Sequence, residues 1–312
     1  MDYPQGPDER RIKGVARAVN STPQPCIQIA LQDIVRQHPE AGEVDMQAIG
    51  LCRFSYPAIG GFQIAHDTIE ERMAFLYRED RMAERFRLFE HVALPCLRAQ
   101  TDPRWNMVVV IGESLPKEHF DRLHDLVADL PQITIQAHPP RPQREVMKEV
   151  LNAARLDPSE LCLQFRYDDD DAVSVNFIER LREAVVDCAG LNAKYQAVAY
   201  DWHKGFAAQF GPDGIAAHEI FFNQCVASLG VHIRGGSKQT IMNFAHHRID
   251  RFMPVVKFAG APMWVESHNS FNDSFANERR DIPFSPLTPE QIGEFEARFA
   301  INADAVKAAF ST

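Results

Sequence analysis

Residues 161–172 read Leu-Cys-Leu-Gln-Phe-Arg-Tyr-Asp-Asp-Asp-Asp-Ala, an apolar run that ends in four consecutive aspartates. Such a run is typical of a strand that is buried in a sheet. Four carboxylates at the mouth of a buried strand repel one another unless a cation neutralises them. The pattern favours a hard divalent metal, Mn²⁺ or Mg²⁺, which takes oxygen ligands and often shares them with phosphate. The stretch therefore indicates nucleotide or phosphate chemistry.

Strand and helix patterns alternate four times before residue 190. This alternation predicts an α/β fold in which a mostly parallel central sheet is flanked by helices. In open sheets of this kind the ligand lies at the carboxyl ends of the strands, where the aspartates are. The expected strands are 48–55, 106–111, 133–137 and 160–167, and the expected helices are 68–98, 117–130, 144–156 and 174–186, the last capped by Ser174.

The two ends of the chain differ from this alternating part. Residues 1–45 are polar and rich in proline, so we expect a poorly ordered extension, with an ordered arm packed on the domain as the alternative. Past residue 190 the sequence predicts a smaller mixed α+β region. Its elements would be a hairpin of 195–200 with 205–210, a helix at 240–250, a strand at 262–267, and in 286–312 a C-terminal helix that Thr288 opens and that Phe295, Phe299 and Ile301 dock.

Composition narrows the class of protein. The chain has 312 residues, 45% of them hydrophobic and 24% charged, which is ordinary for a globular protein. It contains no apolar run that would span a membrane and no signal-peptide pattern, so we expect a cytoplasmic protein. Six scattered cysteines without a CxxC pair are expected to be reduced core thiols. A formal net charge of −10 argues against nucleic-acid binding.

Polar side chains at other predicted strand ends would complete a site with the aspartates. Arg53 and Ser55 end the first strand and Glu113 follows the second, where they would line a base and ribose pocket or simply face solvent. Arg141, Arg144 and Arg166 supply positive charge near the predicted strand ends, where an arginine fork would suit diphosphate. A salt bridge from Arg166 to the aspartates is the alternative.

The aspartates and histidines are candidate metal ligands. In an extended segment the side chains of Asp168 and Asp170 lie on one side, so both would face one ion. A solvated helix cap is the alternative interpretation. His246, His247 and His268 are candidates for a further ligand or a general base, although a lone histidine is more often structural.

The segment 166–173, Arg-Tyr-Asp-Asp-Asp-Asp-Ala-Val, resembles the DxD region of nucleotide-sugar glycosyltransferases with the GT-A fold. Segments 88–102 and 108–114 look like the early helix and second strand of those enzymes. More narrowly, segment 50–55 and Pro262-Met-Trp264 with the later His268 are similar to a rhamnosyltransferase family of bacteria. The resemblance covers roughly residues 46–280.

The resemblance implies a GT-A (Rossmann-like) domain over 46–285, with a nucleotide-binding half at 46–190 and an acceptor half at 191–285. It implies transfer of a sugar, with rhamnose suggested by the family, from a nucleotide diphosphate-sugar donor to a hydroxyl of a glycan or polysaccharide-precursor acceptor. Mn²⁺ or Mg²⁺ would bridge Asp170 and the diphosphate, and Asp168 would hold ribose or a metal-bound water. Peripheral membrane contact is compatible with such an acceptor. A nucleotidyltransferase acting on a sugar phosphate and a non-catalytic nucleotide-sugar-binding protein are the alternatives.

The expected site residues fall into three groups. The Glu-Asp pair that supplies the base in many such enzymes has no convincing match, which leaves the base and the stereochemistry open. We expect catalytic roles for Asp171, His246 and Asp250, nucleotide-sugar binding by Arg53, Phe54, Ser55, Glu113, Arg144, Arg166, Asp168 and Asp169, and metal binding by Asp168, Asp170 and His268.

Overall fold

The computed structural model describes residues 46–61, 66–271 and 281–311. The predicted N-terminal extension at 1–45 and Cys26 lie outside the described residues. The five cysteines within them are free thiols, as expected, and all but Cys188 are buried.

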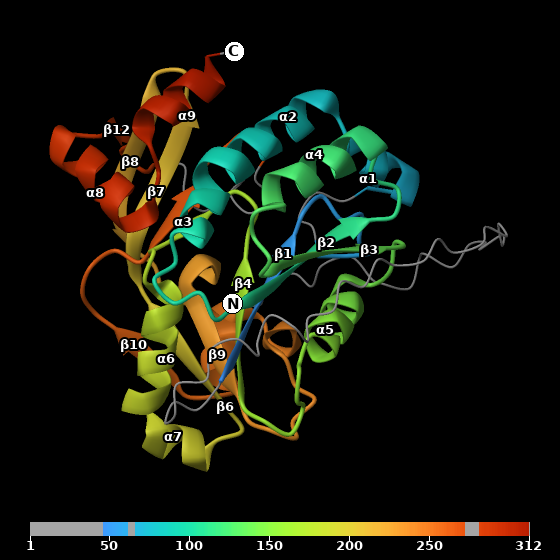
Figure 1. Ribbon diagram of the computed structural model, residues 1–312, viewed down its shortest axis with the longest axis vertical. Helices are drawn as coiled ribbons and strands as arrows, with labels where there is room; N and C mark the ends of the chain where they lie inside the picture. The colour runs from blue at the N-terminus through green and yellow to red at the C-terminus, as the bar shows by residue number, and fades with distance from the viewer. Residues whose placement is uncertain (1–45, 62–65, 272–280, 312) are drawn as a thin grey trace, which may run out of the picture. The chain divides into compact units, whose positions relative to one another are not determined.

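A seven-stranded sheet forms the centre of the fold (Figure 1). Strands β3, β2, β1 and β4 run parallel, and β9 lies antiparallel between β4 and β6. The apolar runs form these strands because both faces are covered, and every residue of β2 is buried. The strand order is β10 (Val255–Phe258), β6 (Ala197–Trp202), β9 (Leu229–Ile233), β4 (Cys162–Tyr167), β1 (Gln47–Arg53), β2 (Asn106–Gly112) and β3 (Ile133–His138).

The strand order reverses at β1. The chain continues from β1 to β2 and β3 on one side, and β4 then pairs with the other side of β1. In open α/β sheets, ligands bind in the crevice at such a switch point, outside the carboxyl ends of the strands. Arg53 and Tyr167, the last residues of β1 and β4, mark that position here. The predicted α/β class with a largely parallel sheet is confirmed.

The structure contains a second, five-stranded sheet. Its five strands follow the order β12 (Ser285–Pro286), β8 (Gly214–Phe221), β7 (Lys204–Gly211), β11 (Trp264–Ser267) and β5 (Ala172–Val173). β5 directly follows the aspartates, so these four residues connect the two sheets.

Helices cover the central sheet on both faces (Figure 1). One face packs against α2 (Glu79–Leu88), η3 (Phe89–Ala93), α3 (Leu94–Arg98), α4 (Lys117–Val127) and α6 (Phe177–Asp187) in the larger core. The other packs against α5 (Gln143–Ala153), η5 (Ile241–Asn243) and η6 (His246–Arg251). The remaining helices are α1 (Ile69–Leu76), α7 (Ala189–Lys194), η4 (Val226–Ser228), α8 (Pro289–Phe299) and α9 (Ala303–Phe310).

Several expected elements differ in the structure. The predicted hairpin is wrong, because β6 and β7 belong to different sheets and β7 instead forms a hairpin with β8. The helix expected at 240–250 consists of two short 3-10 segments. Asn176, rather than Ser174, is the N-cap of α6.

The C-terminal region contains two helices, α8 and α9, where one was expected. Thr288 opens α8 with a capping box, as the sequence indicates. Phe295, Phe299 and Ile301 are fully buried, which confirms their predicted docking role. The Phe206 ring of β7 contacts Phe295 and Phe299, so these helices complete the core beneath the second sheet.

Candidate active site at the carboxyl ends of β1 and β4

The four aspartates between β4 and β5 do not share one environment. Asp169, Asp170 and Asp171 are 4%, 6% and 6% exposed, whereas Asp168 is half-buried. A buried carboxylate requires a compensating charge or hydrogen bonds, because removal from water disfavours its ionised form. The surroundings of each aspartate therefore define its role.

Arg85 on α2 neutralises the two middle aspartates. Its Nη1 atom lies 2.7 Å from Oδ2 of Asp170 and 3.2 Å from Oδ1 of Asp169. Burial raises the pKa of Asp169 to about 6, although the positive charge of Arg85 acts to lower it. Arg81, one helical turn before Arg85, adds a second positive charge that also lowers the pKa of Asp169. The cation beside these carboxylates is thus supplied by the chain itself.

Residues at the end of β11 form hydrogen bonds with the last two aspartates of the segment that connects β4 to β5, which we call the aspartate link. The backbone N–H of Ser267 donates a 2.9 Å hydrogen bond to Oδ1 of Asp171. The Asn269 side-chain amide donates at 2.9 Å to Oδ2 of Asp170. Burial raises the pKa of Asp171 well above its usual range, and the charge of Asp170 raises it further. Asp171 therefore anchors β11 from a buried position, and its catalytic role stays a prediction.

The charge of Asp168 acts on Arg166, which belongs to a group of positive side chains that we call the guanidinium cluster: Arg53, Arg144 and Arg166. Burial lowers the pKa of Arg166, the charge of Asp168 opposes this, and the charges of Arg53 and Arg144 lower it further. Arg53 ends β1, Arg166 is the penultimate residue of β4, and Arg144 lies in the first turn of α5. Three elements distant in sequence thus bring like charges together at the switch point of the sheet.

His246 extends the guanidinium cluster on the η6 side. Its Nδ1 atom lies 3.5 Å from Nη1 of Arg166. Burial, together with the charges of Arg166 and His247, lowers the pKa of His246 to about 4. The imidazole is therefore neutral near pH 7 and adds no positive charge to the cluster.

Ser55 has a left-handed backbone conformation directly after β1, with φ of 48°. Such a conformation is uncommon for residues other than glycine and often occurs at functional sites. Its hydroxyl accepts a 2.9 Å hydrogen bond from Nη1 of Arg81. Ser55 thus places the start of the β1 loop against α2, and its side chain is buried rather than open to a ligand.

Three further predicted site residues are placed apart from the aspartates and the guanidinium cluster. The Phe54 ring is fully buried and packs against Phe86 and Phe89, so it does not line a nucleotide pocket as expected. Glu113 is exposed after β2, where its N–H donates to the His138 carbonyl. Asp250 is exposed on η6 and makes no ion pair within the described part of the chain.

The arrangement does not fit a metal centre built from the expected side chains. Oδ2 of Asp170 already contacts Arg85 and Asn269. The His268 ring packs against Phe284, with ring centroids 5.2 Å apart. Within 46–61, 66–271 and 281–311, no group of three or more His, Cys, Asp or Glu side chains is placed to hold a metal ion. The predicted set of Asp168, Asp170 and His268 is therefore not brought together.

Sequence reasoning missed the partners of the aspartates. Arg81 and Arg85 lie in a strongly charged helix, which reads as a solvated surface element. The available signal was their i, i+4 spacing beside the apolar pair Met82 and Phe86, which places both arginines at the border of the buried stripe. Asn269 carries no recognisable sequence signal.

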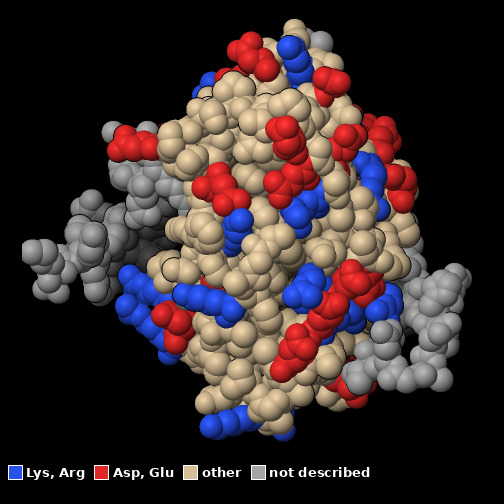
Figure 2. All heavy atoms as spheres, turned by 90° about the vertical axis from the view of Figure 1, so that its left-hand side faces the viewer, with Lys and Arg blue, Asp and Glu red and all other residues tan. Residues whose placement is uncertain are grey.

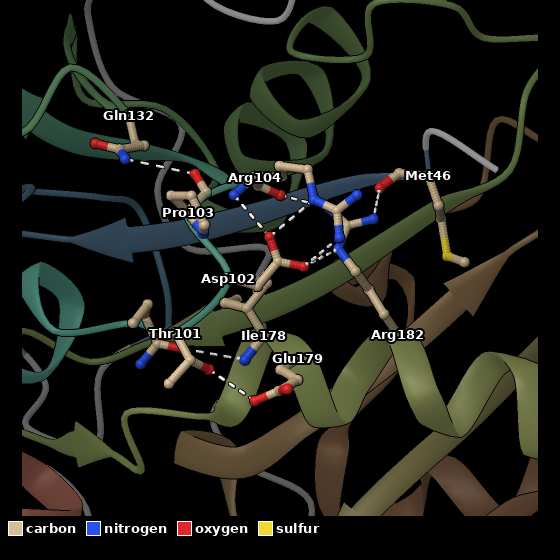
Figure 3. Close-up of polar contacts among 10 residues, drawn as sticks. Met46, Thr101, Asp102, Pro103, Arg104, Gln132, Ile178, Glu179 and Arg182 are labelled. Atoms are coloured by element: carbon tan, nitrogen blue, oxygen red, sulfur yellow. Dashed lines mark hydrogen bonds and ion pairs between the residues drawn. The ribbon is translucent and has the colours of Figure 1, made fainter. Parts of the chain in front are cut away.

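A separate pocket of about 490 Å³ lies near the amino ends of β1 and β2. Asp102 is one of the residues that line it, and Figure 3 shows Arg104 and Arg182 directed toward the Asp102 carboxylate. Burial would raise the pKa of Asp102, but hydrogen bonds from Arg104 and the charge of Arg182 outweigh it, so that the pKa is lowered. Arg182 also donates to the Met46 carbonyl, which ties α6 to the start of β1. We interpret this charge-compensated network as structural.

Comparison with known proteins assigns the family. The family described as "Putative rhamnosyl transferase" matches residues 47–281. The chain belongs to this family. The family is one of glycosyltransferases by its description, the class that the resemblance of the aspartate region implies. No curated protein matches the chain.

The solved structures that the comparison found share little sequence with this family member. Staphylococcus aureus TarS 1-349 has 8% identity and a TM-score of 0.36, and the match covers 71% of this chain but only 60% of that one. The same protein in complex with UDP-GlcNAc has 9% identity and a TM-score of 0.38 over 85% and 71% of the two chains. The 4-diphosphocytidyl-2C-methyl-D-erythritol synthase of Anaerococcus prevotii has 14% identity and a TM-score of 0.32 over 68% and 87%.

The surface of this rhamnosyl transferase family member carries mixed charge. On the face in Figure 2, acidic and basic side chains are interspersed among the described residues rather than gathered into one basic area. Nucleic-acid binding requires a basic footprint, which this face does not offer. In the described part of the chain, every helix is too short or too polar to cross a lipid bilayer.

Proposed function

We propose that this glycosyltransferase moves a sugar from a nucleoside diphosphate-sugar to a hydroxyl of a glycan or polysaccharide precursor. The family description favours rhamnose as the sugar. The observation that carries the proposal is the guanidinium cluster beside Asp168, at the switch point of the central sheet. A strongly anionic ligand is the natural occupant of such a group of like charges.

The diphosphate of the donor would lie against Arg53, Arg144 and Arg166. Planar guanidinium groups form paired hydrogen bonds with phosphate oxygens, and their mutual repulsion is relieved when an anion binds between them. Asp168 is the one aspartate of the link that is half-exposed on this side. Its carboxylate would accept hydrogen bonds from the ribose hydroxyls, which the cationic cluster by itself cannot do.

Transfer requires that the acceptor oxygen bonds to the anomeric carbon while the carbon–oxygen bond to the diphosphate breaks. The bonding electrons leave with the nucleoside diphosphate, and the acceptor hydroxyl proton passes to a base. Guanidinium groups fixed against the diphosphate would stabilise the charge that develops on it. His246 contacts Arg166, so we assign it to the leaving-group side, where it would orient Arg166.

The test is a product assay over a panel of nucleoside diphosphate-sugars that includes rhamnose donors. A glycosyltransferase releases the nucleoside diphosphate in proportion to the sugar transferred. Release of pyrophosphate from a nucleoside triphosphate and a sugar phosphate would instead identify a nucleotidyltransferase. Binding without turnover of any donor in the presence of glycan acceptors would identify a non-catalytic binding protein.

A further inference from the structure

We propose that the protein binds its nucleoside diphosphate donor without a divalent metal ion, because fixed arginines supply the positive charge that a metal would supply. This inference rests on the proposed function. It replaces the metal expected from the four aspartates with Arg85 on the carboxylate side and the guanidinium cluster on the phosphate side.

The carboxylate side is already neutralised within the fold. Arg85 contacts Asp169 and Asp170 at 3.2 and 2.7 Å, and the side chains of Arg85, Asp169 and Asp170 are only 10%, 6% and 9% exposed. An ion pair this deeply buried is screened little by water, so each partner holds the other in place. A metal that displaced Arg85 would separate this buried guanidinium from both of its carboxylate partners, which makes the exchange unfavourable.

One carboxylate oxygen of Asp170 is also engaged by two groups of the chain. Oδ2 of Asp170 accepts the Asn269 amide at 2.9 Å in addition to its contact with Arg85. A carboxylate oxygen offers two lone pairs, so both are directed toward positive or donor groups of the chain. Asn269 is itself held, because its Oδ1 accepts the backbone N–H of Phe271 at 2.9 Å. The donor amide therefore faces Asp170 with a fixed orientation.

The phosphate side repels a second cation. Arg166 lies within range of the charges of Arg53 and Arg144, which repel it, and of Asp168, which attracts it. A divalent ion placed beside these three guanidinium groups would be repelled by their positive charges. The same charges attract a diphosphate. The two requirements of donor binding, neutral aspartates and a cationic phosphate site, are met by separate arginines.

The decisive experiment measures binding of UDP, dTDP and GDP to the full chain by calorimetry, first with EDTA and then with Mn²⁺ or Mg²⁺. The expected result is that at least one nucleotide binds with EDTA and that its Kd changes less than threefold on addition of the metal. Binding that occurs only with Mn²⁺ or Mg²⁺ would overturn the inference and leave the proposed function intact. No binding under any condition would contradict the proposed function itself.

Arg85 provides a second, independent test that does not rely on activity. In Arg85→Met the aspartates lose their cation, so Mn²⁺ without nucleotide should raise the melting temperature of this variant but not of the wild type. Arg85→Met combined with Asp170→Asn also removes one of the two carboxylates that Arg85 contacts, and it should reduce that Mn²⁺ response. The inference is overturned if Mn²⁺ stabilises the wild type as much as it stabilises Arg85→Met.

Discussion

Arg85 and Asp170 form a buried ion pair in which Nη1 lies 2.7 Å from Oδ2, with the two side chains 10% and 9% exposed. The pair joins α2 to the segment that connects the two sheets. It therefore links a helix that covers the central sheet to the strand ends at which we place the donor. The fold and the candidate site depend on the same contact.

Removal of one partner of this pair should destabilise the protein strongly. We expect Arg85→Met to lower the free energy of unfolding by about 3 kcal/mol, because it leaves a buried carboxylate uncompensated. Urea denaturation measures the change. Arg85→Met with Asp170→Asn should recover a large part of the loss, and Lys117→Met, which removes an exposed pair with Asp121, should cost less than about 1 kcal/mol. Equal losses in the single and double variants would contradict this account.

Arg166 should matter for binding and little for stability. We expect Arg166→Met to weaken nucleoside diphosphate binding about tenfold or more, since a charge-assisted hydrogen bond contributes about 1.5–3 kcal/mol. Because the wild-type guanidinium is crowded by Arg53 and Arg144, the melting temperature should stay the same or rise. Calorimetry and thermal denaturation give the two values. Arg98→Met, which removes an exposed pair with Asp129, is the matched control and should bind normally.

The network around Asp102 should contribute to stability alone. Asp102→Asn leaves Arg182 beside a neutral amide, and we expect a loss of about 3 kcal/mol. Asp129→Asn, in an exposed pair with Arg98, should lose less than about 1 kcal/mol. Nucleotide binding at a temperature where each variant is folded should match the wild type. An altered Kd in Asp102→Asn would show that the amino and carboxyl edges of the sheet are coupled.

The buried His232 on β9 should make stability depend on pH. Burial, together with the charge of Arg234, lowers the pKa of His232 to about 4. In the unfolded chain a histidine has a pKa near 6.5. Between these two values the imidazole is therefore neutral in the folded state and protonated in the unfolded state. The free energy of unfolding should therefore fall as the pH decreases from about 6.5 toward 4.

Urea denaturation at pH 7 and pH 5 isolates this histidine. Between these values the wild type should lose about 1 kcal/mol more than His232→Gln, after allowance for solvent screening. The raised pKa of Asp169 acts in the opposite direction, but it is common to both proteins. Parallel losses in the two proteins would exclude a contribution from His232.

The four parallel strands β1 to β4 of the central sheet could be predicted from the sequence, because they are apolar runs separated by amphipathic helices. Strands β9 and β10 were not expected. The aspartates follow β4 directly, so their place at a carboxyl edge could be predicted as well. The ion pair of Arg85 with Asp169 and Asp170 could not, because it joins residues more than 80 positions apart and local periodicity carries no such information. For the same reason β6 and β7 read as a hairpin, although they belong to different sheets.

The central claim is that the guanidinium cluster binds the diphosphate of the donor. Its most direct test compares the wild type with a variant that carries both Arg53→Met and Arg166→Met. The measurement is the release of nucleoside diphosphate from its sugar donor in the presence of acceptor. The account predicts turnover by the wild type and a loss of at least about a hundredfold in the variant, from two lost charge-assisted contacts, while the melting temperature is retained. Turnover by the variant at the wild-type rate would contradict it.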